Sequence, residues 1–311
     1  MTISSHAPEF AGLPVFPFYP RGEVPDDPAA VAWKVEVDDF EAPAEDFAQL
    51  LEALLASVPA GRIRALVLGE WGGSFENAPP IDLLVSLAPR LSGLRALFVG
   101  ELTAEECEIS WIHHQDITPL LLAYPALEVL RVRGADGLAL RPVHHTALRE
   151  LAFESGGLPA PVVRAVADSD LPALERLDLW LGTSQYGGDA RVDDLAPILT
   201  GDRLPALRHL ALCDAEIADA LAAAVSTAGI VARLEVLDLS MGELTDEGAD
   251  ALLAGQSLTH LRRLDLHHHF LSPATQERVA AALPGVAVDL SDPQEVEEYN
   301  GETYRYVAVG E

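Results

Sequence analysis

An apolar pattern of the form L-x-x-L-x-L recurs along most of the chain and sets its organisation. The eight clear copies are Ile63-Leu66-Leu68, Leu94-Leu97-Val99, Leu127-Leu130-Val132, Leu148-Leu151-Phe153, Leu174-Leu177-Leu179, Leu207-Leu210-Leu212, Leu234-Leu237-Leu239 and Leu261-Leu264-Leu266. Their mean spacing is about 28 residues, a period typical of repeat architectures. The last two apolar positions of each copy are two residues apart, so both point to one side of an extended strand. Each copy therefore predicts one short strand of a stacked sheet.

The segments between the strands predict how the chain returns to the start of the next repeat. Strands of neighbouring repeats stack to bury the apolar stripe, and the return legs lie outside. Most of these connecting segments have the pattern of helices, and several begin with Pro, Asp or Thr. We predict helices over residues 80–91, 117–123, 161–167, 193–199, 218–227, 246–253 and 273–283. The short leg between Leu127 and Leu148 contains Gly134, Gly137 and Pro142, so it predicts a turn or extended segment.

The seventh repeat carries a resemblance to a known fold family. Its sequence over 234–253, Leu-Glu-Val-Leu-Asp-Leu-Ser-Met-Gly-Glu-Leu-Thr-Asp-Glu-Gly-Ala-Asp-Ala-Leu-Leu, is similar to a leucine-rich repeat of the ribonuclease-inhibitor type. The resemblance covers about residues 60 to 290. It implies an α/β solenoid, a curved right-handed superhelix with a parallel sheet on its concave face and mostly helices on its convex face. It implies no particular activity.

The repeats depart from that family at the position that usually carries Asn or Cys. The residues found there are Trp71, Leu102, Ala135, Gly156, Gly182, Ala215, Gly242 and His269. In the family, this side chain satisfies backbone groups of the turn. We therefore expect glycine turns or water to satisfy those groups here.

A closer resemblance extends over nearly the whole chain. The segments Ile109-Ser-Trp-Ile-His, Glu154-Ser-Gly-Gly-Leu-Pro, Leu179-Trp-Leu-Gly-Thr-Ser-Gln-Tyr-Gly-Gly-Asp and Leu264-Asp-Leu-His-His-His resemble an uncharacterised bacterial, mainly actinobacterial, family of cytoplasmic leucine-rich-repeat proteins. Genes of that family tend to lie beside genes for radical-SAM and ATP-grasp enzymes. The resemblance thus implies a biosynthetic setting, without catalytic residues to carry over.

Both ends of the array need a cover, because a solenoid exposes its core there. Residues 31–37 alternate apolar and charged side chains and predict a covering strand, followed by a helix over 45–58. Tyr304, Tyr306 and Ala308 alternate with Arg305, Val307 and Val309 and predict a final strand or clip. We therefore expect an N-terminal cap over 1–60, a solenoid of eight to nine repeats over 61–290, and an acidic loop with a terminal strand over 291–311. Together they form one continuous domain.

Charge and composition restrict the class of partner. Forty-nine acidic against 20 basic residues give a net charge of −29 at pH 7. This charge disfavours nucleic acids and anionic membranes, which bind clustered cations. Basic partners, or partners with a basic patch, remain compatible with this charge, since the negative electrostatic field of the protein would attract them. The alternative is that the charge only keeps the protein in solution.

The sequence favours a cytoplasmic monomer without a cofactor. It shows neither a secretion signal nor an apolar stretch of membrane-spanning length. Cys107 and Cys213 lie far apart in the repeat register, which disfavours a disulfide. Phosphate-binding glycine loops and the nucleophile-elbow motif are absent. We therefore expect a chain that is not an enzyme.

Strand residues that point away from the core form rows across the predicted concave face. Candidate partner-binding residues on these rows are Phe98, Arg131, Arg133, Glu154, Asp178, Trp180, His209, Asp238, Asp265 and His267. Such a mixture of aromatic and charged side chains is the composition that carries binding energy in interfaces. The alternative is that opposite charges, such as Arg133 and Glu154, only pair across strands and stabilise the sheet.

Loops after the strands supply a second candidate surface. Trp71, Trp111, His113 and Tyr186 lie there, where repeat proteins present ligand contacts; as an alternative, they cover the rim of the core. The residues therefore predict a scaffold that binds a protein or peptide on its concave face, with enzymes of a biosynthetic gene cluster as clients.

The main alternative is a metal-dependent accessory or enzyme that uses the His and Asp groups near His267 and His113. His267 and His269 would share one face of a strand, so at most two of them could bind one ion, while zinc sites need three or four ligands. The favoured interpretation is therefore that these are turn histidines without a metal.

Overall fold

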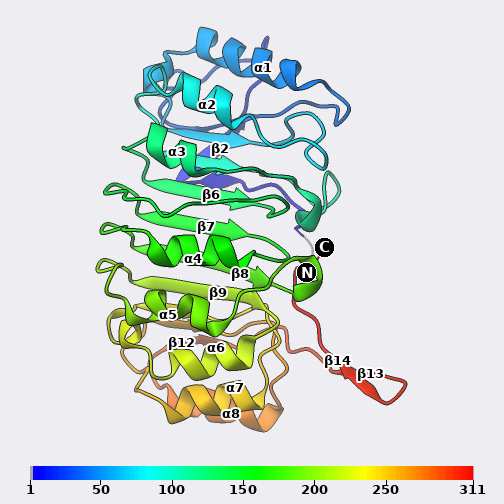
Figure 1. The fold of residues 1–311 in the computed structure, drawn as a ribbon, viewed down its shortest axis with the longest axis vertical. Helices are drawn as coiled ribbons and strands as arrows, with labels where there is room; N and C mark the ends of the chain where they lie inside the picture. The colour runs from blue at the N-terminus through cyan, green and yellow to red at the C-terminus, as the bar shows by residue number, and fades with distance from the viewer. Residues whose placement is uncertain (1–2, 311) are drawn as a thin grey trace. The chain divides into compact units, whose positions relative to one another are not determined.

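The computed structural model describes residues 3–310, which divide into two compact units. The N-terminal unit ends at Glu154, and the C-terminal unit runs from Ser155 to Gly310. Each consists of strands, most of them parallel, that alternate with helices or turns (Figure 1). This is the α/β architecture that the apolar pattern predicts, and it is consistent with a leucine-rich-repeat solenoid.

In the N-terminal unit the strands follow one another in sequence order. They are β1 (Glu9–Phe10), β2 (Leu13–Pro17), β3 (Ala32–Val35), β4 (Ala65–Leu68), β5 (Ala96–Val99), β6 (Val129–Arg133) and β7 (Glu150–Glu154). Only β1 and β2 are antiparallel; the later neighbours are parallel. The second apolar residue of each copy pairs with its equivalent, so Leu66, Leu97 and Leu130 form one fully buried stack. The helices are α1 (Ala44–Ser57), α2 (Ile81–Leu87) and α3 (Thr118–Ala123).

The C-terminal unit repeats this plan. Its parallel strands are β8 (Arg176–Gly182), β9 (His209–Ala215), β10 (Val236–Asp238), β11 (Arg263–Asp265) and β12 (Ala287–Asp289). Its helices are α4 (Ala160–Asp168), α5 (Val192–Thr200), α6 (Ala218–Val225), α7 (Asp246–Ala254) and α8 (Pro273–Ala282). Leu177, Leu210, Leu237 and Leu264 pair in register and are fully buried.

The predicted return legs are confirmed within a few residues at their ends. All seven predicted helices of the array are present, from α2 to α8. The leg between Leu127 and Leu148 has no helix, as Gly134, Gly137 and Pro142 predict. Gly134 and Gly137 have φ angles of 91° and 67°, a region that favours glycine. A turn segment therefore replaces a helix in this repeat.

A strand and a helix are present near the N-terminus where they were predicted, as β3 and α1, and the segment before them also packs on the sheet. Phe10 packs on Phe98 with ring centroids 5.5 Å apart. Leu13 and Val15 pack on the same cluster, which contains Ala65 and Val67. Residues 7–15 therefore cover the face of the N-terminal unit's sheet that points away from the helices. We call this side of each sheet the helix-free face.

Side chains satisfy backbone groups at two places between the strands and helices. Gly182, at the position of the family's Asn or Cys, instead has a φ of 67°, as a glycine turn requires. Asp219 accepts hydrogen bonds from the Thr245 and Gly248 amides. The fully buried His269 accepts a hydrogen bond from the Leu271 amide through Nδ1 and contacts the Leu290 carbonyl through Nε2. His269, at the position of the family's Asn or Cys, therefore satisfies the turn of its own repeat.

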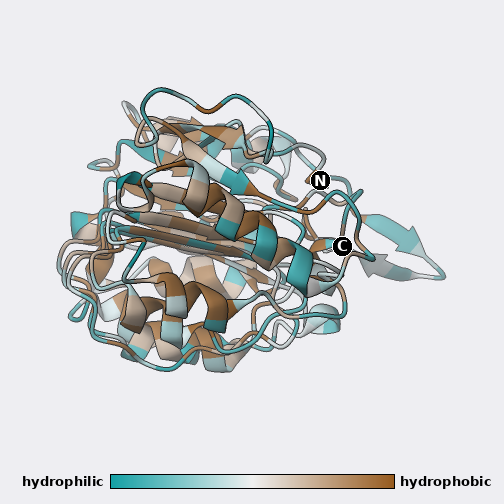
Figure 2. Ribbon diagram, turned by 90° about the horizontal axis from the view of Figure 1, so that it is seen from above, coloured by the Kyte–Doolittle hydropathy of each residue, from teal (hydrophilic) through white to brown (hydrophobic). Residues whose placement is uncertain are grey.

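The C-terminal end differs from the predicted single strand. An exposed hairpin of β13 (Glu297–Tyr299) and β14 (Glu302–Tyr304) extends away from the strands and helices of its unit (Figures 1 and 2). Of the two predictions for this end, a strand or a clip, the strand through Val309 is wrong, because β14 ends at Tyr304. Residues 307–309 instead form a buried strap on the end of β9 and the loop after β10, where the Ala308 amide donates to the Met241 carbonyl.

Candidate functional site

The candidate residues of the N-terminal unit lie beneath the chain's own N-terminal segment. Phe98 is fully buried against Phe10. The guanidinium groups of Arg131 and Arg133 lie 5.4 and 5.2 Å from the Phe98 ring centroid. Phe98 and Arg133 therefore offer a partner almost no surface, whereas Arg131 keeps about a third of its side chain exposed.

Arg133 and Glu154 form a buried ion pair across β6 and β7. Arg133 Nε lies 2.8 Å from Glu154 Oε2, and Arg133 also donates to the Leu102 carbonyl. Arg131 lies 3.4 Å from the other oxygen of Glu154. This geometry agrees with the alternative of cross-strand pairing, because Arg133 and Glu154 satisfy each other's charge inside the sheet.

Sequence reasoning missed a second buried charge cluster in the same unit. Lys34 Nζ lies 2.6 Å from Glu36 and 2.9 Å from Glu101, and only 3% of the Lys34 side chain is exposed. Glu101 also accepts a hydrogen bond from the Ala7 amide and contacts His6 Nδ1. Burial opposes the lysine charge, but the two carboxylates prevail and raise the Lys34 pKa. This cluster fastens the N-terminal segment over the helix-free face. The sequence feature that could have indicated this cluster is the position of Lys34 among the apolar residues of β3.

The helix-free face of the C-terminal unit is more open. Trp180, Asp178 and His209 are half-buried on β8 and β9, and Arg176 and Arg263 are exposed. Asp265 is held between Arg263 Nη2 at 2.6 Å and His267 Nδ1 at 2.8 Å. The strands of this unit therefore carry an aromatic and charged group of side chains, with Asp238 on β10.

Burial and neighbouring charges shift the pKa values of the patch residues in different directions. The hydrogen bond to Asp265 raises the pKa of His267, which favours its charged form. Burial, with Arg176 and Arg263 nearby, lowers the pKa of His209 to about 4. Burial and the charge of Asp265 raise the pKa of Asp238. Near neutral pH the patch thus combines a neutral histidine with fixed charges of both signs.

The loop candidates separate into buried and exposed residues. Trp71 is 1% exposed and donates from Nε1 to the Asn77 carbonyl, so it covers the core. Trp111 is 59% exposed at the end of a 3₁₀ helix over Ile109–Trp111. His113 pairs with Asp136 at 2.8 Å, and Tyr186 is half-buried in the C-terminal unit.

The histidines do not converge on a metal-binding arrangement. The expectation that His267 and His269 share a strand face is wrong, because β11 ends at Asp265 and His268 adopts a φ of 54°. His269 consequently turns into the interior. Across residues 3–310, no group of three or more His, Cys, Asp or Glu side chains is placed to hold an ion.

Comparison with solved structures shows the family of this chain. A Bacteroides fragilis protein of known crystal structure is 32% identical to this chain, with a TM-score of 0.77. The match covers 84% of this chain and 74% of the other. The chain belongs to the same family as this protein.

Other comparisons add less. A leucine-rich-repeat protein from Leptospira interrogans is 15% identical with a TM-score of 0.35, over 84% of this chain and 61% of its own length. No protein-family model matches the sequence, and no curated protein matches it. Within residues 3–310, no helix is both long and apolar enough to cross a membrane.

Proposed function

We propose that this chain is a non-catalytic scaffold that binds a protein or peptide on the helix-free face of its C-terminal unit. The carrying observation is the half-buried Trp180 on β8, in a patch with the charged Arg176 and the exposed Arg263. Tryptophan and arginine are the residue types most often responsible for binding energy in interfaces. Strands hold them with fixed backbones, which lowers the entropic cost of binding.

The charges of this patch are fixed before a partner arrives. Asp265 is bound by Arg263 and His267, so its carboxylate needs no rearrangement. A partner with one polar and one apolar group could contact the ion pair and Trp180 together. Enzymes encoded beside the gene are the first clients to test, because the family resemblance implies that setting.

An enzymatic function is less well supported by the same residues. His267 bound to Asp265 resembles part of a catalytic triad. Ser240 and Cys213 precede it at equivalent repeat positions, but they are 1% and 2% exposed. Burial raises the Cys213 pKa well above its ordinary value, so the thiol stays protonated. A substrate would reach neither nucleophile.

The test is affinity capture followed by binding measurements on the purified partner. The protein is immobilised, bound proteins from the native cell are identified, and the affinity of the purified partner is measured. Trp180→Ala is expected to weaken binding by about 2 kcal/mol or more while thermal unfolding stays close to the parent. Asp250→Ala is the matched control, because Asp250 forms only an exposed ion pair with Arg278 between α7 and α8. Equal affinity of the Trp180 variant and the parent would reject this surface.

A further inference from the structure

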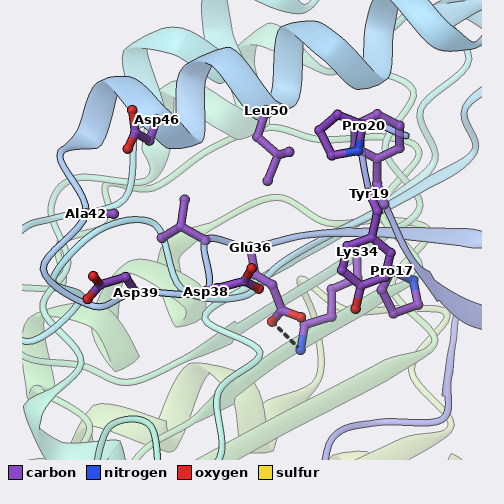
Figure 3. Close-up of a pocket in the computed structure, with 12 residues that line it drawn as sticks. Pro17, Tyr19, Pro20, Lys34, Glu36, Asp38, Asp39, Ala42, Asp46 and Leu50 are labelled. Carbon is purple, nitrogen blue, oxygen red and sulfur yellow. Dashed lines mark ion pairs between the residues drawn. The ribbon is translucent and has the colours of Figure 1, made fainter. Parts of the chain in front are cut away.

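A cavity of about 300 Å³ lies in the N-terminal unit, between the end of β2, the loop after β3 and helix α1. Figure 3 shows Tyr19 and Pro20 on one side of it and Asp38, Asp39 and Asp46 on the other. This volume is at the lower limit for ligand pockets, so it suits a single long side chain. None of its residues belongs to the helix-free face of the C-terminal unit.

The charges around this cavity are not balanced. Four carboxylates line it, and Lys34 is the one cation among its lining residues. Lys34 is already bound to Glu36 and Glu101. Asp38, Asp39 and Asp46 have no ion-pair partner within the described part of the chain. By contrast, Asp265 and Asp289 of the C-terminal unit share Arg263. The cavity therefore offers uncompensated negative charge.

Apolar surface lies inside the cavity and beside it. Leu50 and Val37 line it, and the exposed ring of Tyr19 forms one side. The residue after Asp39 is Phe40, which is 55% exposed and contacts Phe75 with ring centroids 6.3 Å apart. Two exposed phenylalanines in contact form an apolar platform next to an acidic opening.

The loops that carry this platform are fixed by internal hydrogen bonds. Glu70 accepts from the Gly72 and Ser74 amides, and the Asn77 side chain donates to the Gly72 carbonyl. Asp39 accepts from the Glu41 amide through its side chain, which closes the turn at Phe40. The platform is thus formed before binding, so little conformational entropy is lost when a ligand docks.

From these observations we propose that this cavity binds an arginine side chain of a basic peptide segment in a partner protein. The guanidinium group stacks on Tyr19 and pairs with Asp38, Asp39 or Asp46. Its aliphatic stem contacts Leu50 and Val37, and a neighbouring apolar residue packs on Phe40 and Phe75. Arginine fits because its planar group both stacks on an aromatic ring and pairs with carboxylates. This site is independent of the proposed surface around Trp180.

The test uses two fluorescein-labelled peptides, Gly-Arg-Leu-Arg-Gly and Gly-Glu-Leu-Glu-Gly, and the full-length protein. We expect the arginine peptide to bind with a Kd below about 1 mM, and the glutamate peptide not to bind. Both Asp38→Asn/Asp39→Asn and Phe40→Ala should weaken binding about fivefold or more. Higher salt should weaken it further without abolishing it, because the stacking contact is not screened.

A charge-matched variant distinguishes a site from the general field of the protein. Glu52→Gln/Asp82→Asn also removes two carboxylates from the N-terminal unit. Glu52 lies on α1 and Asp82 on α2, and neither residue lines the cavity. It should bind the peptide within about twofold of the parent. Equal weakening by both double variants, or no binding of the arginine peptide, would overturn the proposal. Trp180→Ala should leave peptide binding unchanged. The peptide experiment therefore tests only the cavity, and the capture experiment with Trp180→Ala tests only the proposed function.

Discussion

The carboxyl group of Asp214, near the end of β9, accepts a hydrogen bond of 2.8 Å from the backbone amide of Val309 and so fixes the C-terminal strap to that strand. Asp214 is fully buried, and its second oxygen has no hydrogen-bond partner within the described residues. Burial raises the pKa of Asp214 to about 8, so the carboxyl is largely protonated at neutral pH. The anchoring of the strap is therefore coupled to pH.

The first prediction is that Asp214 makes the protein less stable as pH rises. Its folded pKa of about 8 exceeds the ordinary value of 3.8, so between these values the native state keeps a proton that the unfolded chain loses. This contribution is present below about pH 4 and is lost as pH rises to 8, with a limiting slope of ~1.4 kcal/mol per pH unit.

Asp214→Asn keeps an acceptor for the Val309 amide but removes this titration. Urea unfolding at pH 5, 6, 7 and 8 should show the stability advantage of the parent over the variant shrinking with pH. Amide exchange at Ala308 and Val309 should accelerate at pH 8 in the parent relative to the variant, after correction for intrinsic exchange. Parallel pH curves for the two proteins would contradict the coupling.

The second prediction concerns the buried pair of Arg133 and Glu154. Arg133→Ala should destabilise the N-terminal unit by about 3 kcal/mol, because Glu154 is left buried with its main partner removed. From the sequence we would expect the fold to tolerate this change, since Arg133 points away from the repeat core. The double variant Arg133→Met/Glu154→Leu should recover most of the loss, because both buried charges are then gone. Thermal unfolding measures the stability of both variants. A melting curve of Arg133→Ala like that of the parent would refute the predicted destabilisation.

The third prediction tests the turn histidine. His269→Leu leaves the Leu271 amide and the Leu290 carbonyl without their partners, at a cost of about 1–3 kcal/mol. His113→Leu is the comparison, because His113 makes a more exposed pair with Asp136 and should cost less than about 1 kcal/mol. Chemical denaturation measures the free energy of unfolding of both variants. A similar decrease in the two variants would contradict the prediction that the buried His269 contributes more stability than His113.

The fourth prediction concerns the register of the repeats. Leu237→Asp should unfold at least the C-terminal unit, because it places an unpaired charge between the fully buried Leu210 and Leu264. Circular dichroism and thermal melting report the loss. A folded variant that melts with the parent would require a different set of core positions.

The sequence determined the repeat architecture because its signal is local and periodic. Leu66, Leu97 and Leu130 stack in the expected register, since a shift of one residue would move every leucine to the opposite face. The helix-free return leg around Gly134 and Pro142 was predictable for the same local reason. Asp178 and Trp180 lie on β8 and His209 lies on β9, in strands that the apolar pattern predicts.

Tertiary structure alone decided what covers that face and where the chain ends pack. Phe98 is a surface position by period, yet Phe10, 88 residues earlier, buries it. The cluster of Lys34 with Glu101 and the contact of Asp214 with Val309 likewise join residues far apart in sequence. Periodicity reports which side of a strand a residue occupies, whereas burial depends on which distant segment packs there. The cavity beside Tyr19 arises in the same way, because β2, the loop after β3 and α1 form it only when folded together.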